Sequence, residues 1–279
     1  MPPKMPTVLL TRSEHQVEPM KTQLESQGFR VLLQPVIEIL PPESWQPMDE
    51  VLHKLRQNEF DWLLFSSRNG VHAFFDRLAF HEGTPPPRET TNGVIPSMPL
   101  CDTDSLCDTR YISRIKIAVV GSGTDGALYQ RSGRYADVVP ETFTAEYVAE
   151  MLLPEAKQGK RFLHLRANRG RDVLQRLLTE SGGCVTEIAV YQSVDRTEAD
   201  PLIVKLLQQG GIDFITVTSS ATARSLVAMF GGLLRHTLLV SISPITSRTL
   251  CELGFPPAQE AEEASLAGMV NALARVASR

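Results

Sequence analysis

The stretch Leu9-Leu10-Thr11-Arg12 returns later in the chain as Leu163-His164-Leu165-Arg166, at an offset of 154 residues (12 to 166). In each copy the apolar run is followed by a helical pattern, by glycine and then by another apolar run. A second pair of similar stretches, Phe65-Ser66-Ser67-Arg68 and Val217-Thr218-Ser219-Ser220, lies at an offset of 152 residues (67 to 219). These repeats indicate two copies of one structural unit.

Short β-branched or apolar runs alternate with amphipathic helical stretches along both copies. This alternation is typical of parallel sheets joined by crossover helices. We therefore predict an α/β fold with two similar doubly wound, flavodoxin-like lobes and a cleft between them. Ligands of such sheets bind beyond the carboxyl ends of the strands, so residues at those ends are the candidate site residues. The runs expected to form strands cover residues 8–10, 29–35, 61–65, 115–120, 161–165, 213–217 and 238–242.

A proline-rich insertion is expected in the first copy only. The offset falls to 122 residues (124 to 246) for the third pair of similar stretches, which is about 30 fewer than before. Residues 81–113 lie between these landmarks, carry five prolines and have no helical or strand periodicity. We interpret them as a surface insertion, with a functional lid as the alternative.

Composition excludes several classes of protein. The chain has 279 residues, of which 42% are hydrophobic and 22% charged, as in an ordinary globular protein. The net charge of −4 gives no positive field for nucleic acid or an anionic membrane. The longest apolar run, Leu226 to Phe230, is far shorter than the ~20 residues of a membrane span. The first apolar run is too short for a signal peptide, and the four cysteines form no C-x-x-C pair. We therefore expect a cytoplasmic protein with unpaired thiols.

The stretch Gly121-Ser122-Gly123-Thr124-Asp125-Gly126 matches the G-x-G-x-x-G pattern of dinucleotide-binding turns, and Glu141 follows at the spacing of a ribose-binding carboxylate. Gly133, however, breaks the following helix early, and the equivalent stretch Ser243-Pro244-Ile245-Thr246 has no glycine. An NAD-dependent enzyme is therefore one hypothesis. The other is a tight strand-to-helix turn with Thr124 as the helix cap.

Serine and threonine hydroxyls recur at equivalent predicted strand ends of the two copies. Ser67 and Ser219 share one such position, and Thr124 and Thr246 share another. Hydroxyls beside the N–H groups of a helix start can bind carboxylate or phosphate oxygens without a cofactor. Plain helix capping is the alternative interpretation.

Two arginines and one tyrosine add further candidates. Arg12 and Arg166 follow equivalent predicted strands, and arginine binds carboxylates bidentately, although a solvated surface position is the alternative for each. The stretch Ile188-Ala189-Val190-Tyr191-Gln192 is expected to end an apolar strand, where the phenol of Tyr191 could donate a proton to a leaving oxygen. The alternative for Tyr191 is packing with a hydrated hydroxyl.

The histidines give no sign of a metal site or a catalytic triad. The six are scattered, and none forms an i, i+4 pair with a carboxylate between. His164 lies in a predicted core strand and is expected to be simply buried.

The order of these motifs resembles the uroporphyrinogen-III synthase family from about residue 7 to residue 276. The insertion at 81–113 departs from the family pattern, as does Ser243, where the family commonly has glycine before Pro-x-Thr. The second departure raises a question about the backbone before Thr246. The stretches that carry the resemblance are Leu10-Thr11-Arg12, Pro35-Val36-Ile37, 65–71, Val120-Gly121-x-x-Thr124, Gly170-Arg171-Asp172-x-Leu174, Val190-Tyr191-Gln192, Thr218-Ser219-Ser220 and Thr246.

The resemblance implies two lobes joined by a two-strand linker, one lobe formed by residues 1–36 and 195–279 and the other by 37–194. It implies a lyase that converts hydroxymethylbilane, a linear tetrapyrrole polycarboxylate, to uroporphyrinogen III. The implied reaction loses water, inverts the terminal pyrrole through a spiro intermediate and closes the macrocycle. The family uses no cofactor or metal. Tyr191 matches the family's catalytic tyrosine, and Ser67, Thr124, Ser219 and Thr246 match its cleft positions.

Two rival functions remain at this point. One is the NAD-dependent enzyme that the glycine turn would support, and the other is a non-catalytic two-lobe protein that binds a tetrapyrrole or another anion. In the preferred interpretation the chain acts as a monomer on a small-molecule substrate.

Overall fold

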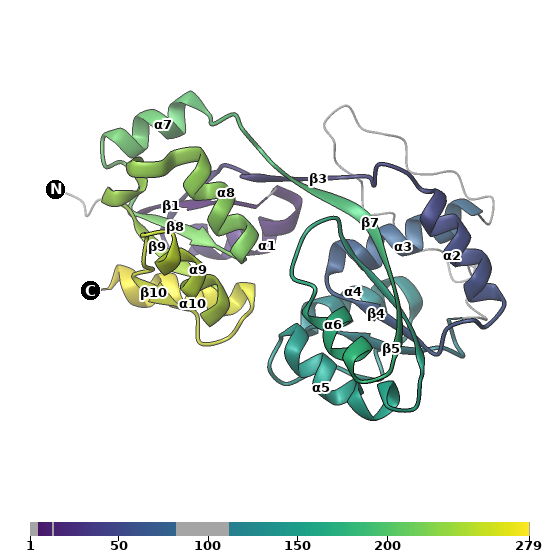
Figure 1. The fold of residues 1–279 in the computed structure, drawn as a ribbon. Helices are drawn as coiled ribbons and strands as arrows, with labels where there is room; N and C mark the ends of the chain where they lie inside the picture. Colours follow the sequence, from purple (N-terminus) through teal and green to yellow (C-terminus); the bar gives the residue numbers. More distant parts are fainter. Residues whose placement is uncertain (1–4, 13, 82–111, 279) are drawn as a thin grey trace. The chain divides into compact units, whose positions relative to one another are not determined.

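The computed structural model describes residues 5–12, 14–81 and 112–278 and divides the chain into two compact units (Figure 1). The first unit combines Met1–Glu38 with Val194–Arg279, and the second is Ile39–Ser193. The insertion expected at 81–113 lies almost wholly outside the described residues. No helix of the described residues has the length and apolar character needed to cross a membrane.

The first unit is built on a five-stranded sheet in the order β10-β9-β8-β1-β2. Its pairings are parallel, with Leu10 opposite Leu33 in β1 and β2 and Val217 opposite Ser241 in β8 and β9. β1 and β8 are completely buried runs of four residues, as expected for central strands covered on both faces. The strands are β1 (Thr7–Leu10), β2 (Arg30–Leu33), β8 (Phe214–Val217), β9 (Leu238–Ser241) and β10 (Gln259–Glu260).

Helices cover both faces of the first sheet. One apolar core joins the sheet to α1 and α10, and a second joins its other face to α7, α8 and α9. α1 ends before Gly28, whose φ of 85° is a left-handed conformation that glycine adopts at little cost. The helices are α1 (Glu14–Ser26), α7 (Pro201–Gln208), α8 (Ser220–Phe230), the 3-10 helix η1 (Gly231–His236), α9 (Pro244–Glu252) and α10 (Leu266–Ala277).

The second unit repeats this architecture with the sheet order β3-β7-β6-β4-β5. β4 pairs in parallel with β5 and β6, and β6 pairs in parallel with β7, where His164 lies opposite Glu187. The chain passes between the units within β3 and near the end of β7, and these two strands are neighbours in the sheet. The strands are β3 (Ile37–Leu40), β4 (Trp62–Phe65), β5 (Lys116–Val119), β6 (Arg161–Ala167) and β7 (Cys184–Asp195).

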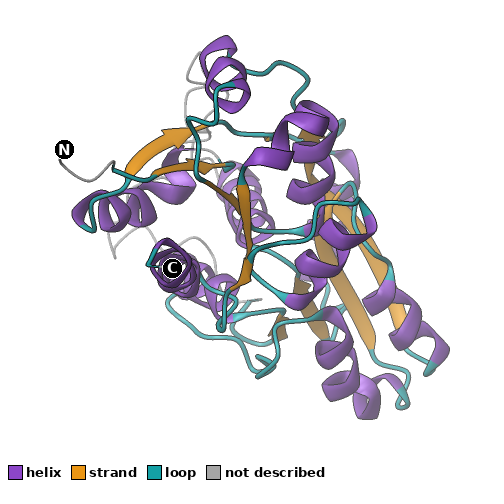
Figure 2. Ribbon diagram, turned by 90° about the vertical axis from the view of Figure 1, so that its left-hand side faces the viewer, coloured by secondary structure: helices purple, strands orange, loops and turns teal. Residues whose placement is uncertain are grey.

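Helices again flank the sheet on both faces, as the ribbon of Figure 2 shows for its orange strands. α2, α3 and α4 share one apolar core with the sheet, and α5 and α6 share the other. The α/β fold with two parallel-sheet lobes is therefore confirmed. The helices are α2 (Gln46–Arg56), α3 (Arg68–His81), α4 (Ser122–Ser132), α5 (Ala145–Ala156) and α6 (Val173–Glu180).

The two sheets correspond residue by residue at the offset first seen in the sequence. Leu10 pairs with Leu33 in the first unit, and His164 pairs with Glu187 in the second, each 154 residues later (10 to 164 and 33 to 187). The same position in the two sheets is therefore apolar in one and ionisable in the other.

Candidate active site

The carboxyl ends of β4, β5 and β6 meet at one edge of the second sheet because these strands run in parallel. Ser67 lies just beyond β4, and its Oγ accepts a hydrogen bond from the Gly70 N–H at 3.1 Å. A Cβ atom on Gly70 would lie 3.3 Å from the Leu165 carbonyl oxygen, so glycine lets the start of α3 approach β6 closely. Ser67 therefore caps α3 at the edge where ligands of such sheets bind.

The Tyr191 hydroxyl lies 3.0 Å from Ser67 Oγ, although the two residues are 124 positions apart in the chain. Tyr191 pairs with Ala167 where the register between β6 and β7 shifts, and its ring packs in the apolar core with 8% of the residue exposed. β7 continues to Asp195, so the expectation that Tyr191 ends a strand is wrong. The burial holds the ring in one orientation while its hydroxyl reaches the cap of α3.

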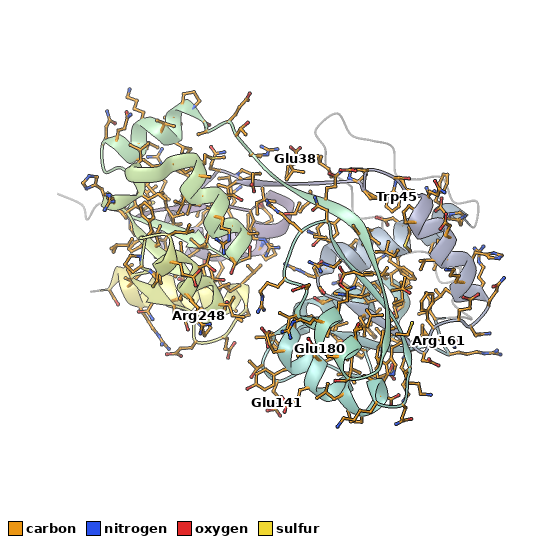
Figure 3. The ribbon with its side chains drawn as sticks, in the orientation of Figure 1. Glu38, Trp45, Glu141, Arg161, Glu180 and Arg248 are labelled. Carbon is orange, nitrogen blue, oxygen red and sulfur yellow. The ribbon has the colours of Figure 1, made fainter. Side chains whose placement is uncertain are left out.

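The glycine turn after β5 lies at the same edge, and Gly121 rather than Thr124 is the N-cap residue of α4. Thr124 is in the first turn, donates its N–H to the Gly121 carbonyl at 2.9 Å and is 7% exposed. A Cβ atom on Gly121 would lie 3.2 Å from Cγ of Phe143. The Phe143 ring thus packs against the first glycine, the one that forms the tight turn in dinucleotide-binding motifs. Glu141, the expected ribose carboxylate, is exposed in the loop before α5 (Figure 3).

Four residues near this edge form a continuous polar array. Ser66 Oγ lies 2.5 Å from Nε2 of His164, whose Nδ1 lies 3.0 Å from Oε2 of Glu187. Arg166 Nη1 donates to the other oxygen of Glu187 at 2.9 Å. The hydrogen bond from His164 is the largest influence holding the pKa of Glu187 below its ordinary value of 4.5, and Arg166 adds to it against the cost of burial. His164 is therefore buried, as expected, but it is also bonded at both ring nitrogens.

The arginines of the second unit differ in how their charge is used. Arg166 is 9% exposed and forms an ion pair with Glu187, and Arg171 forms an ion pair with Glu146 on α5. Arg68, the first residue of α3, has no carboxylate partner among the described residues, and its side chain lies beside Gly123, whose added Cβ would be 3.8 Å from the arginine Cδ. Within the described residues, Arg68 is therefore a cation without a carboxylate partner at this edge.

The first unit presents a corresponding edge of its own. Ser219 caps α8, with the Thr222 N–H donating to its Oγ at 3.0 Å, and Ser243 caps α9 in the same way through Thr246 at 3.5 Å. Thr246 is 2% exposed and its Oγ1 lies 3.1 Å from Ser243 Oγ. Arg12 lies two residues beyond β1 and is half-buried.

Ser243 has φ −162° and ψ 161°, an extended conformation open to any residue. The serine that replaces the family's usual glycine therefore leaves the turn intact and supplies a helix cap. The backbone before Thr246 is regular.

The structure brings together some of the predicted residues and adds others. Ser67 and Tyr191 are in contact, Thr124 lies on the neighbouring helix, and Arg166 is directed to Glu187 instead. Sequence patterns alone did not indicate the role of Arg68 or the hydrogen bonds of His164. Arg68 directly follows Ser67, so its position at a predicted helix start was a usable signal.

A pocket of about 260 Å³ lies at the opposite, amino edge of the second sheet. Its lining includes Trp62, Lys116 and Glu155, and the ammonium of Lys116 pairs with Glu155 at 3.1 Å. Two of the charged residues that line the pocket therefore neutralise each other. The pocket also lies at the opposite end of the strands from Ser67. In the described part of the chain no group of histidine, cysteine and acidic side chains could hold a metal ion.

Comparison with known proteins places these observations in one family. The family model described as "Uroporphyrinogen-III synthase HemD" matches residues 18–271. The uroporphyrinogen-III synthase of Synechococcus elongatus is 30% identical over 276 residues, covering 96% of this chain and 94% of that protein. The uroporphyrinogen-III synthase of Chlorobaculum parvum is 26% identical over 254 residues, covering 90% of this chain and 91% of that protein.

Solved structures give the same fold. A mutant uroporphyrinogen III synthase of Thermus thermophilus matches with a TM-score of 0.63 at 18% identity, covering 98% of this chain and 99% of that one. The uroporphyrinogen-III synthetase of Helicobacter pylori matches with a TM-score of 0.56 at 16% identity, covering 99% of this chain and 100% of that one.

Proposed function

The chain belongs to the uroporphyrinogen-III synthase family, and from that premise we propose that it converts hydroxymethylbilane to uroporphyrinogen III. The observation that carries the proposal at the level of residues is the contact of the Tyr191 hydroxyl with Ser67 Oγ at 3.0 Å. Both residues match family motifs, and they meet at the edge of a parallel sheet where ligands bind.

The proposed reaction is that of a lyase. The hydroxyl of the substrate leaves with a proton as water, and the remaining azafulvene is electrophilic. The terminal pyrrole is inverted through a spiro intermediate, the macrocycle closes, and a proton is released from the attacking pyrrole. The substrate supplies the electrophile itself, so the protein has to bind a flexible polyanion with its two ends together and assist departure of the hydroxyl.

Tyr191 is the proposed proton donor to the leaving hydroxyl. Its ring is fixed in the core, and Ser67 can accept from or donate to the phenol, which holds the hydroxyl at the edge of the sheet. One positioned general acid contributes at most about 10²–10⁴-fold, and we assign Tyr191 about 1–3 kcal/mol of the barrier.

The carboxylates of the substrate are proposed to bind at helix starts. Helices α3 and α8 begin at Ser67 and Ser219, where N–H groups and the helix dipole favour anions. Arg68 adds a cation to the first of these sites, and Arg12 follows β1, which pairs with β8 in the first sheet. Thr124 and Thr246 are largely buried, so in this proposal they shape the helix starts rather than provide exposed hydroxyls.

The test is to incubate the purified chain with freshly prepared hydroxymethylbilane and separate the products by chromatography. We expect the type III isomer, whereas unassisted closure yields type I. Tyr191→Phe should lower the initial rate about 10- to 100-fold with the fold intact. Tyr129→Phe is the matched control, because Tyr129 is 46% exposed and stacks on Tyr135 at the surface. Equal rates for Tyr191→Phe and wild type would remove Tyr191 from the mechanism, and binding without type III product would favour a non-catalytic binding protein.

We further propose a monomeric, cytoplasmic enzyme that needs no cofactor. Size-exclusion chromatography at assay concentration tests the first point, and full activity after extensive dialysis against a chelator tests the last.

A further inference from the structure

We propose that Ser66, His164 and Glu187 form a catalytic triad that makes Ser66 a nucleophile toward small activated acyl or phosphonyl electrophiles. This site is separate from the proposed tetrapyrrole chemistry, which uses the next residue, Ser67. The three side chains are joined at 2.5 Å between Ser66 Oγ and His164 Nε2 and at 3.0 Å between His164 Nδ1 and Glu187 Oε2.

The hydrogen bonds fix the direction of proton transfer. An ionised carboxylate only accepts hydrogen bonds, so the Glu187 contact places the proton of neutral His164 on Nδ1. Nε2 then carries a lone pair and can only accept, which makes Ser66 the donor. A hydroxyl that donates to an imidazole held by a carboxylate is the arrangement that activates serine nucleophiles.

The base and its carboxylate are rigidly held. His164 is 3% exposed, within the central strand β6, and Arg166 Nη1 binds the second oxygen of Glu187 at 2.9 Å. The arginine keeps the carboxylate ionised and oriented, since it contributes to the depressed pKa of Glu187. Ser66, by contrast, is partly exposed.

The fold does not require this array. In the first unit the residues equivalent to His164 and Glu187 are Leu10 and Leu33, which pair in the same register. In the first unit the residue equivalent to Ser66 is Thr218, which directly precedes the helix cap Ser219. Burying an ionisable pair is expensive and an apolar pair serves the same sheet, so the array needs an explanation other than folding.

The position of Ser66 supplies the remaining part of an acyl-transfer site. It lies between the end of β4 and the start of α3, and the first N–H groups of a helix have no partner within the helix. Apart from the Gly70 N–H, which donates to Ser67 Oγ, these groups can stabilise the negative oxygen that forms when the serine attacks a carbonyl or phosphonyl centre.

In the proposed reaction, Ser66 hydrolyses an activated ester in two steps, acylation and deacylation. Ser66 Oγ bonds to the carbonyl carbon of an activated ester while its proton passes to His164 Nε2. The alkoxide or phenolate leaves and takes that proton, giving an acyl-serine. Water then attacks the acyl group and loses a proton to His164, which passes it to Ser66 Oγ as the carboxylic acid leaves. With a fluorophosphonate, the serine oxygen bonds to phosphorus and displaces fluoride, the serine proton passes through His164 to water, and the adduct remains.

The experiment treats the full chain with a fluorophosphonate and maps the adduct by peptide mass spectrometry. Ser219 serves as an internal control, because it is a helix cap at an equivalent strand end but lies beside Thr222 rather than histidine. We expect labelling at Ser66 at least about 10²-fold faster than at Ser219, the usual contribution of a general base. Labelling at Ser66 no faster than at Ser219 would overturn the proposal.

Variants then separate activation from exposure. Ser66→Ala should abolish the adduct, and His164→Gln should slow labelling of Ser66 by about 10²-fold or more while the thermal unfolding midpoint stays well above the assay temperature. Retention of the wild-type labelling rate in His164→Gln would contradict the triad. The wild-type map needs no variant, so the proposal stays testable if His164→Gln does not fold. Neither result depends on tetrapyrrole turnover, so failure of the proposed synthase reaction would be seen independently.

Discussion

Replacing Glu187 by glutamine should destabilise the second unit at neutral pH and much less in acid. The carboxylate accepts from Arg166 at 2.9 Å and from His164 at 3.0 Å, and an amide cannot accept at both ends. One donor would face the amide NH₂, and the charge of Arg166, whose side chain is 11% exposed, would lose its partner. Breaking a fully buried pair costs about 3–5 kcal/mol; because the Glu187 side chain is 23% exposed, we expect about 2–3 kcal/mol.

The pH dependence follows from the depressed pKa of Glu187. A carboxyl whose pKa is lower in the folded protein adds stability that is fully present above its unfolded value and is lost as pH falls through the folded value. The difference between wild type and Glu187→Gln should therefore be constant above about pH 5.5 and shrink progressively below 4.5, the ordinary value. Urea unfolding followed by circular dichroism at pH 7, 4.5 and 3.5 measures this difference.

The control for this prediction is Glu180→Gln, at a residue labelled in Figure 3. Glu180 pairs with Arg176 at 3.3 Å, but the two side chains are 59% and 52% exposed, so the change should cost less than about 0.5 kcal/mol. A loss of stability in Glu187→Gln no larger than in this control at pH 7, or one that is the same at all three pH values, would contradict the role given to Glu187.

Substitutions at three further positions test other parts of the structure. Gly170→Ala should lower stability by about 1–3 kcal/mol in thermal unfolding, because Gly170 has φ 143° and a Cβ atom there would lie 2.8 Å from Nη2 of Arg166; a neutral effect would contradict the backbone described. Asp49→Asn should lower the free energy of unfolding by about 1–2 kcal/mol at pH 7, because Asp49 accepts a hydrogen bond from Arg77 that is the largest cause of its lowered pKa. The loss should become progressively smaller as pH falls below the ordinary value of 3.8, and calorimetry at two pH values checks this direction. Ser219→Ala should cost about 1 kcal/mol through the loss of the α8 cap, while Ser219→Gly should cost only a few tenths; equal losses would argue against capping.

Local sequence patterns predicted much of the fold because they report local causes. Apolar runs located the cores of β4, β5 and β8 to within one or two residues, since almost every residue of these strands is buried. Glycine located the end of α1 because Gly28 adopts a left-handed conformation. The end of β7 was misplaced because its last residues are polar and its length depends on pairing with β3, which lies far away in the chain.

The candidate site was harder to predict, because its contacts join residues far apart in the sequence. Ser66 and His164 are 98 positions apart and His164 and Glu187 are 23 apart, so no motif of fixed spacing could indicate their contact. Thr124 was expected to cap a helix, but the extended residue before the helix is Gly121, and only the backbone dihedrals decide between them. Arg166 was predicted as a charge available to bind substrate, but it pairs with Glu187 on the neighbouring strand, a contact that no local pattern reveals.

The central claim is that this chain directs closure of a linear tetrapyrrole with inversion of one ring. The most direct test is the isomer composition of the product at early times, measured by chromatography with purified protein and hydroxymethylbilane. The account predicts that type III forms in excess, in proportion to protein concentration, and falls toward the uncatalysed composition in Tyr191→Phe. A product that is type I at every protein concentration would contradict it.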